Sequence, residues 1–400
     1  MTSASRTPEE FDPAQFDHEH PAFQADPYAV YTRMRLAEGG SCQRTPDGPR
    51  MFFRHADVAR LLVDQRLSDL RATPLLPVQR RGEGGGPPMS YLSPGHLTPR
   101  VRTIVHERAA RIPRTGTIDV MGDFADQLPA AIITGLLPDA GPLALELALW
   151  SEQVAGLLRP LPRPATDLAE QGAVLVDGLA RVAADSEPDT LLAWLTRQEA
   201  DGRSGSERAA AAQCLRLAVA VQQVRYLVGN AVQALGRHPV QLALLRSEPG
   251  LLPLAVEEFL RYDSPVQYTT RVANRSFDYQ GWRIEAGQSV RLYTASAHRD
   301  PGHYPRPDEL DVTRRNNRHL VFTGAHLGLY AAVTRVVCRE AVAALLTELP
   351  AFTVLPAPGR RWDVAAGLYA VVELPVAIHQ EPPHRRRSAR LRSVGQSPRR

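Results

Sequence analysis

The stretch AVEEFLRYDSPVQYTTRVANRSFDYQGWRIEAGQSVRLYTASAHRDPGHYPRPDELDVTRR, residues 255–315, decides the fold. It begins within a predicted helix, 251–262, in which Glu258 and Arg261 stand three residues apart. Residues at that spacing share one helix face and can form an ion pair. The segment 267–295 is rich in predicted strand. The pattern indicates a fold that combines helices with a small β part.

This stretch closely resembles the C-terminal half of bacterial cytochrome P450 monooxygenases. Glu258 and Arg261 match the Glu-x-x-Arg helix of that family, and Arg314 matches the loop arginine that completes its structural triad. Arg271 matches a residue that usually binds a haem propionate. The resemblance implies the cytochrome P450 fold.

The rest of the chain is consistent with this resemblance, which covers most of residues 20–380. Asp26-Pro27-Tyr28 and the run ADVARLL stand at the family's distances. The longest helical pattern, 206–235, is apolar nearly all round and predicts a buried central helix. Further helices are predicted over 26–37, 56–63, 101–115, 121–137, 143–158, 167–184, 188–199 and 328–349, with a hairpin over 42–53 and a loop over 72–95. Strands and helices do not alternate along the chain, so the expected class is mainly α with a minor β part: a helical body with small β-sheets.

The domain organisation follows from composition and charge. We expect a flexible N-terminal arm over 1–20, a single P450-like domain over 21–379 and a disordered, arginine-rich tail over 380–400. The chain has 400 residues and a formal net charge of +4. Because the tail holds seven arginines and one glutamate, the remainder is close to neutral and does not indicate nucleic-acid binding.

Localisation and metal binding are also constrained by the sequence. No stretch approaches the roughly 20 apolar residues of a membrane span, and the acidic start does not resemble a signal peptide. We therefore expect a cytoplasmic protein with no membrane partner. The three cysteines are too few and scattered for a disulfide framework or a metal site. His18-Glu19-His20 is expected to lie on a solvated arm, so no metal site is predicted.

The haem-ligand loop departs from the family pattern. The family loop carries a cysteine whose thiolate holds the iron and favours O–O cleavage. Here the corresponding stretch, residues 319–340, reads HLVFTGAHLGLYAAVTRVVCRE. Matching His326 to the pattern puts Gly328 in the place of the cysteine and Tyr330 in the place of a glycine. Cys338 lies too far along the following helix and is expected to be a buried core residue. We therefore expect that the thiolate and the haem are lost and that no cofactor is bound.

The positions that handle oxygen and contact haem depart as well. The family's central helix carries an acid and a threonine that relay protons to oxygen, and here Gln222 and Gln223 stand in their place. Glutamine amides form hydrogen bonds but do not act as general acids. His96 and Arg100 imitate the family's haem-contacting His-x-x-x-Arg motif, although that helix is expected to be deleted. His96, Arg271, His326, Gly328, Gln222 and Gln223 are thus vestigial positions, and no catalytic residue is predicted.

These losses spare the scaffold residues, which points to a protein kept folded for a role other than monooxygenation. Haem-free relatives of the family are known as auxiliary proteins of antibiotic glycosyltransferases. The resemblance therefore implies a protein that binds and activates or stabilises a glycosyltransferase in natural-product biosynthesis. A small apolar ligand in the vacated pocket is possible.

Three alternatives with a function stay open, beside the product of a decayed gene that has none. The chain could use the pocket, with Gln222, Gln223, Arg225 and Tyr226, for non-redox chemistry on a polyketide-like substrate. It could recruit other oxygenases, as haem-free P450-like domains of glycopeptide assembly lines do. It could also hold haem through another ligand, with His326 the first candidate, and keep an oxidative activity.

Overall fold

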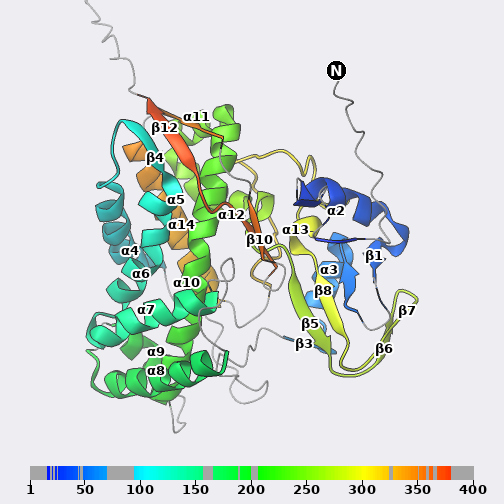
Figure 1. Cartoon of the computed structure of the whole chain (residues 1–400), viewed down its shortest axis with the longest axis horizontal. Coiled ribbons are helices and arrows are strands. Elements are labelled where there is room, and N and C mark those ends of the chain that lie inside the picture. Colours follow the sequence, from blue (N-terminus) through cyan, green and yellow to red (C-terminus); the bar gives the residue numbers. More distant parts are fainter. Residues whose placement is uncertain are drawn as a thin grey trace, which may run out of the picture.

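The computed structural model describes residues 16–69, 94–155, 165–199, 206–349 and 351–379. Short gaps remain at 19, 21–22, 25, 44, 46–47, 188–189, 324–327, 357–359 and 364–366. Its helices are α2 Pro27–Leu36, α3 His55–Leu62, α4 Pro94–Ala109, α5 Val120–Asp123, α6 Leu128–Leu136, α7 Pro142–Ala155, α8 Ala165–Asp185, α9 Leu191–Glu199, α10 Ser206–Arg237, α11 Pro239–Ser247, α12 Leu252–Tyr262, α13 Thr294–Ala297 and α14 Gly328–Glu348. The helical body lies on one side of the molecule and a strand-rich part on the other (Figure 1).

The strands form small sheets, as the sequence predicts. They are β1 Ser41–Cys42, β2 Arg50–Phe52, β3 Leu67–Asp69, β4 Gly116–Asp119, β5 Thr269–Ala273, β6 Phe277–Tyr279, β7 Trp282–Ile284, β8 Ser289–Leu292, β9 Ala351–Val354, β10 Arg361–Asp363, β11 Leu368–Ala370 and β12 Pro375–His379. The largest sheet has the order β1-β2-β8-β5-β3, and only its β2–β8 pair is parallel. A second sheet has the order β4-β12-β9. The fold class predicted from the sequence, mainly α with a minor β part, is confirmed.

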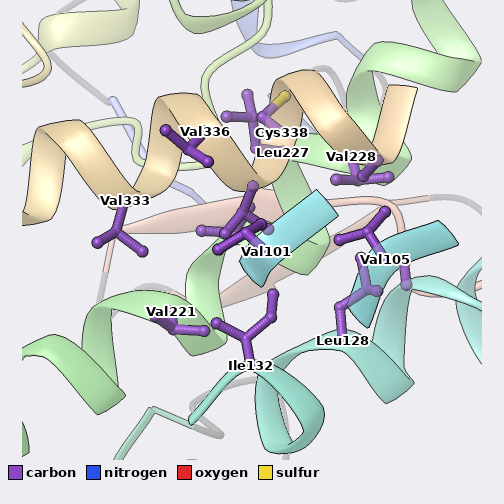
Figure 2. Close-up of a cluster of buried hydrophobic side chains, with 14 of the residues drawn as sticks. Val101, Val105, Leu128, Ile132, Val221, Leu227, Val228, Val333, Val336 and Cys338 are labelled. Atoms are coloured by element: carbon purple, nitrogen blue, oxygen red, sulfur yellow. The ribbon is translucent and has the colours of Figure 1, made fainter. Parts of the chain in front are cut away.

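Helix α10 is the centre of the helical body. Its side chains are buried on nearly every side between Ala210 and Leu235, because α6, α7, α8, α9 and α14 all pack against it. Figure 2 shows part of this core, in which α4, α6, α10 and α14 meet. The residues labelled there are Val101, Val105, Leu128, Ile132, Val221, Leu227, Val228, Val333, Val336 and Cys338.

The structure corrects the expected helix over 121–137. The chain instead forms α5, a single 3₁₀ turn (Ala125–Gln127) and α6. The break lies at Phe124, whose φ of −140° and ψ of −64° are not helical. Phe124 is fully buried, so its side chain contributes to the core while its backbone changes direction.

The structure also corrects the end of the N-terminal arm. Phe16 and His18 are buried, with 1% and 6% of their surfaces exposed. The rings of Phe16 and Phe53 make an edge contact at 5.4 Å, and a hydrogen bond of 2.8 Å joins His18 Nε2 to the Tyr293 hydroxyl. His18 is therefore a core residue and not part of a solvated arm. Residues 1–15 and 380–400, where the rest of the arm and the tail are predicted, lie outside the described residues.

Candidate functional site

The two glutamines at the centre of α10 point to different neighbours. Gln222 is 3% exposed and donates through Nε2 to the Ala148 carbonyl at 3.2 Å and to the Ser151 hydroxyl at 3.0 Å. Both acceptors belong to α7. The amide of Gln222 therefore satisfies buried polar groups of the scaffold, since an unpaired buried amide would cost free energy.

Gln223 connects α10 to the start of α14. Its Oε1 accepts a hydrogen bond of 2.9 Å from the Tyr330 hydroxyl. The Tyr330 ring in turn makes an edge contact with Phe322, with ring centroids 5.5 Å apart. The sequence singled out Tyr330 for its bulk beside the ligand loop. Its hydrogen bond was not foreseen, because the partner lies 107 residues away in the chain.

Arg225 and Tyr226 do not join the glutamines in one reactive cluster. Arg225 is buried and lies 3.7 Å from both Asp126 and Glu152, while its Nη2 donates to the Tyr226 hydroxyl at 3.1 Å. These acids lie on the turn before α6 and on α7, respectively. The arrangement is an ion-pair network, and it places no nucleophile beside a base.

The three cysteines lie in β1, α10 and α14. Cys338 is fully buried in the core shown in Figure 2, among apolar side chains of α4, α10 and α14. Burial raises the pKa of its thiol well above the usual value, and it raises the pKa of Cys214 to about 12. Both therefore remain protonated thiols at neutral pH. Cys42 is half-buried in β1.

The structure describes some of the other positions that the resemblance matches to the haem site. Arg271 is buried in β5, where its Nη1 donates to Thr269 Oγ1 at 3.4 Å. Gly328 is the first residue of α14. His96 lies within α4, but its side chain is outside the described residues, as is the whole of His326.

The three residues of the scaffold triad, Glu258, Arg261 and Arg314, are in direct contact. Glu258 and Arg261 are completely buried and form two hydrogen bonds of 2.8 Å, and Arg314 lies 3.2 Å from the same carboxylate. Asn317 donates a further bond of 2.8 Å to Glu258. These contacts tie the loop after α13 to α12.

A second clamp, which the sequence analysis missed, uses the neighbouring Glu257. Its carboxylate lies 2.6 Å from Arg335 of α14 and 3.0 Å from His319. Burial acts to raise the pKa of Glu257, but the bonds from His319 and Arg335 outweigh burial and lower it to about 2. The pair of adjacent acids, Glu257 and Glu258, was the available signal in the sequence. Side chains at two successive helix positions point in different directions, so each can contact a different element.

Comparison with known proteins identifies the fold family. The family described as "Cytochrome P450" matches residues 233–322. The "Vitamin D(3) 25-hydroxylase" of Pseudonocardia autotrophica is 31% identical, over 82% of this chain and 87% of its own length. The chain belongs to the cytochrome P450 family.

Two further relatives agree. The "Cytochrome P450 monooxygenase PikC" of Streptomyces venezuelae is 33% identical to this P450, over 84% of this chain and 87% of its own. The solved structure of "the cytochrome P450 enzyme CxnD for C-S bond formation in chuangxinmycin biosynthesis" superimposes with a TM-score of 0.70 at 27% identity, covering 88% of this chain and 94% of that one.

Family membership overturns our expectation that the chain carries no cofactor. Cytochromes P450 are haem proteins, and the relatives are named as members of that family. The expectation rested on the ligand loop, on Gln222 and Gln223, and on the expected deletion of the haem-contacting helix. Arg271, which the resemblance matches to a propionate-binding position, is buried in β5.

Two of the three cysteines are core residues. Cys214 and Cys338 are buried thiols with raised pKa values, and Cys42 belongs to the strand-rich part. Within the described ranges, no group of three metal-ligating side chains occurs and no helix is long and apolar enough to cross a membrane. No reaction step through an iron-bound thiolate follows from these residues.

Proposed function

We propose that this P450 acts as an auxiliary protein that binds and activates or stabilises a glycosyltransferase of natural-product biosynthesis. The observation that carries the proposal is the identity and the hydrogen bonding of Gln222 and Gln223. They stand at the positions where the family resemblance places an acid and a threonine, and both amides are engaged in hydrogen bonds between helices.

The physical argument concerns proton delivery. Oxygen activation needs a group that donates protons in the active site, and a glutamine amide does not titrate in the relevant range. The hydrogen bonds of Gln222 and Gln223 tie α10 to α7 and to α14. A rigid helical body with these links is suited to present a fixed surface to a partner protein. The proposal does not depend on whether haem is bound.

The experiment is a reconstitution of sugar transfer. The genes beside this one are searched for a glycosyltransferase, which is purified alone, with this P450, and with PikC as a control of the same fold. We expect co-purification and a rise in transfer rate of about tenfold, within the ordinary range of coupling between binding events, with this P450 and not with PikC.

Two results would count against the proposal. One is an equal rate in all three samples without co-purification. The other is hydroxylation of a pathway intermediate by this P450 when a ferredoxin and its reductase are supplied, because that product requires the oxygen chemistry that the glutamines are argued not to support.

A further inference from the structure

A pocket of about 530 Å³ lies at the junction of four elements: the start of α2, the end of α10, the end of α12 and the β10–β11 hairpin. Its size is within the range of small-molecule sites. Arg237 lines it and stands fourteen residues after Gln223 on α10. That separation is about 21 Å along the helix axis, so the pocket is distinct from the glutamine site.

Most charged groups of this pocket already have partners. Arg360 forms a bidentate pair with Asp263, and Arg299 donates to Asp308 at 2.9 Å. The Asp26 carboxylate caps α2 by accepting hydrogen bonds from its first two amides. The charges of the two ion pairs cancel, whereas the Asp26 carboxylate is held by backbone amides alone.

Two donors remain. Arg237 is exposed at the C-terminal end of α10, and Tyr369 of β11 lines the pocket with only 6% of its surface exposed. Among the described residues, neither the guanidinium nor the phenol has a hydrogen-bond or carboxylate partner. Burial raises the pKa of Tyr369, against the opposing charge of Arg360, so its hydroxyl stays protonated and can donate.

We propose that this pocket binds a small molecule through an oxyanion, a carboxylate or a phosphate, held between the Arg237 guanidinium and the Tyr369 hydroxyl. An arginine and a hydroxyl are a usual donor set for such groups. The rings of Tyr28 and Tyr262 line the same pocket, and the Arg299 guanidinium lies over one face of each ring, 4.4 Å and 3.9 Å from the ring centroids.

The test is a titration of the full-length protein with two probes, inorganic phosphate and benzoate, at constant ionic strength. The Trp362 ring stacks on Tyr369 with centroids 4.7 Å apart, so its fluorescence reports occupancy. A Trp362→Phe variant lacks this fluorophore and so shows how much of the fluorescence change comes from Trp362. We expect saturable binding of at least one probe, and the preferred probe tells whether the ligand group is a phosphate or a carboxylate.

Two variants and a matched control decide the outcome. Loss of a hydrogen bond to a charged group should weaken binding by roughly tenfold or more in Arg237→Gln and by a similar factor in Tyr369→Phe. Arg111→Gln removes the same charge from an exposed position after α4 and should leave the affinity unchanged. Absence of saturable binding of both probes, or equal weakening by Arg111→Gln and Arg237→Gln, would overturn the proposal.

Discussion

The phenol of Tyr330 and the amide of Gln223 meet between α14 and α10 at 2.9 Å. This bond and those of Gln222 link α10 to α14 and to α7. At the scale of single residues, the contacts of individual hydroxyl and thiol groups lead to predictions that single substitutions can test.

Tyr330→Phe removes one hydroxyl and keeps the ring. We expect the free energy of unfolding to fall by about 1 kcal/mol, the usual net value of a buried or half-buried hydrogen bond. Urea denaturation measures it. Tyr262→Phe is the matched control, since the Tyr262 hydroxyl has no hydrogen bond among the described residues. Equal losses in the two variants would contradict the role assigned to Tyr330.

The thiols make a second prediction at this scale. Cys214 and Cys338 are buried with raised pKa values, whereas Cys42 is half-buried near the surface. Because the thiolate is the reactive form, Ellman's reagent at pH 8 should label one thiol quickly in the native protein and all three after denaturation. Cys42→Ser should abolish the fast phase. Rapid labelling of Cys338 would show that its surroundings are open to solvent.

At the scale of elements, the connections around α12 dominate. Glu258 of α12 holds Arg261 and Arg314, and Glu257 on the next position holds α14 through Arg335. The loop after α13 and the last long helix are thus both attached to one short helix.

Glu258→Gln should be strongly destabilising, because it leaves Arg261 buried without its counter-charge. We expect a loss of about 3–5 kcal/mol in the free energy of unfolding, or an insoluble protein. Glu309→Gln is the control: it removes an exposed pair with Arg306 and should cost less than about 1 kcal/mol. Similar stabilities of the two variants, by urea unfolding or soluble yield, would refute the assignment.

The sequence predicted elements best where their pattern is local. The central helix, expected over 206–235, is observed as Ser206–Arg237, and the hairpin over 42–53 is observed as the β1–β2 pair. Both depend on spacing and turn residues within one segment. The break at Phe124 was missed because Pro129, which lies in the first turn of α6 and is a local signal of a helix start, was included in one continuous helix.

The contacts of the candidate site were harder to predict from the sequence than the elements. Gln222 and Gln223 were identified from the resemblance, but their partners Ser151 and Tyr330 lie 71 and 107 residues away. Burial of Phe16 was missed for the same reason, since its aromatic neighbour Tyr293 is far from it along the chain. Contacts of this range leave no periodic signal in either segment.

At the scale of the whole molecule, acid should weaken the fold through buried histidines. Burial lowers the pKa of His298 well below 6.5 and, with His303 nearby, lowers that of His55 to about 4. The unfolded chain therefore binds more protons below pH 6.5 than the native protein does. Stability is retained above that value and decreases as pH falls from 6.5 toward 4.

His298→Gln keeps a side-chain acceptor at the Nε2 position for the Leu320 amide but does not titrate. We expect its free energy of unfolding to decrease less between pH 6.5 and pH 5 than that of the wild type. His106→Gln, on the exposed face of α4, should follow the wild type. Parallel curves for all three proteins in urea titrations would contradict this account.

The largest sheet also governs how the chain can fold during synthesis. Strands β1, β2 and β3 come from residues 41–69, but β2 pairs in parallel with β8 at 289–292 and β3 pairs with β5 at 269–273. About two hundred residues must therefore be translated before these early strands find their partners. Their unpaired edges are exposed to other nascent chains throughout that interval. Slow, cool expression with abundant chaperones should consequently favour soluble product over aggregate, whatever the stability of the finished molecule.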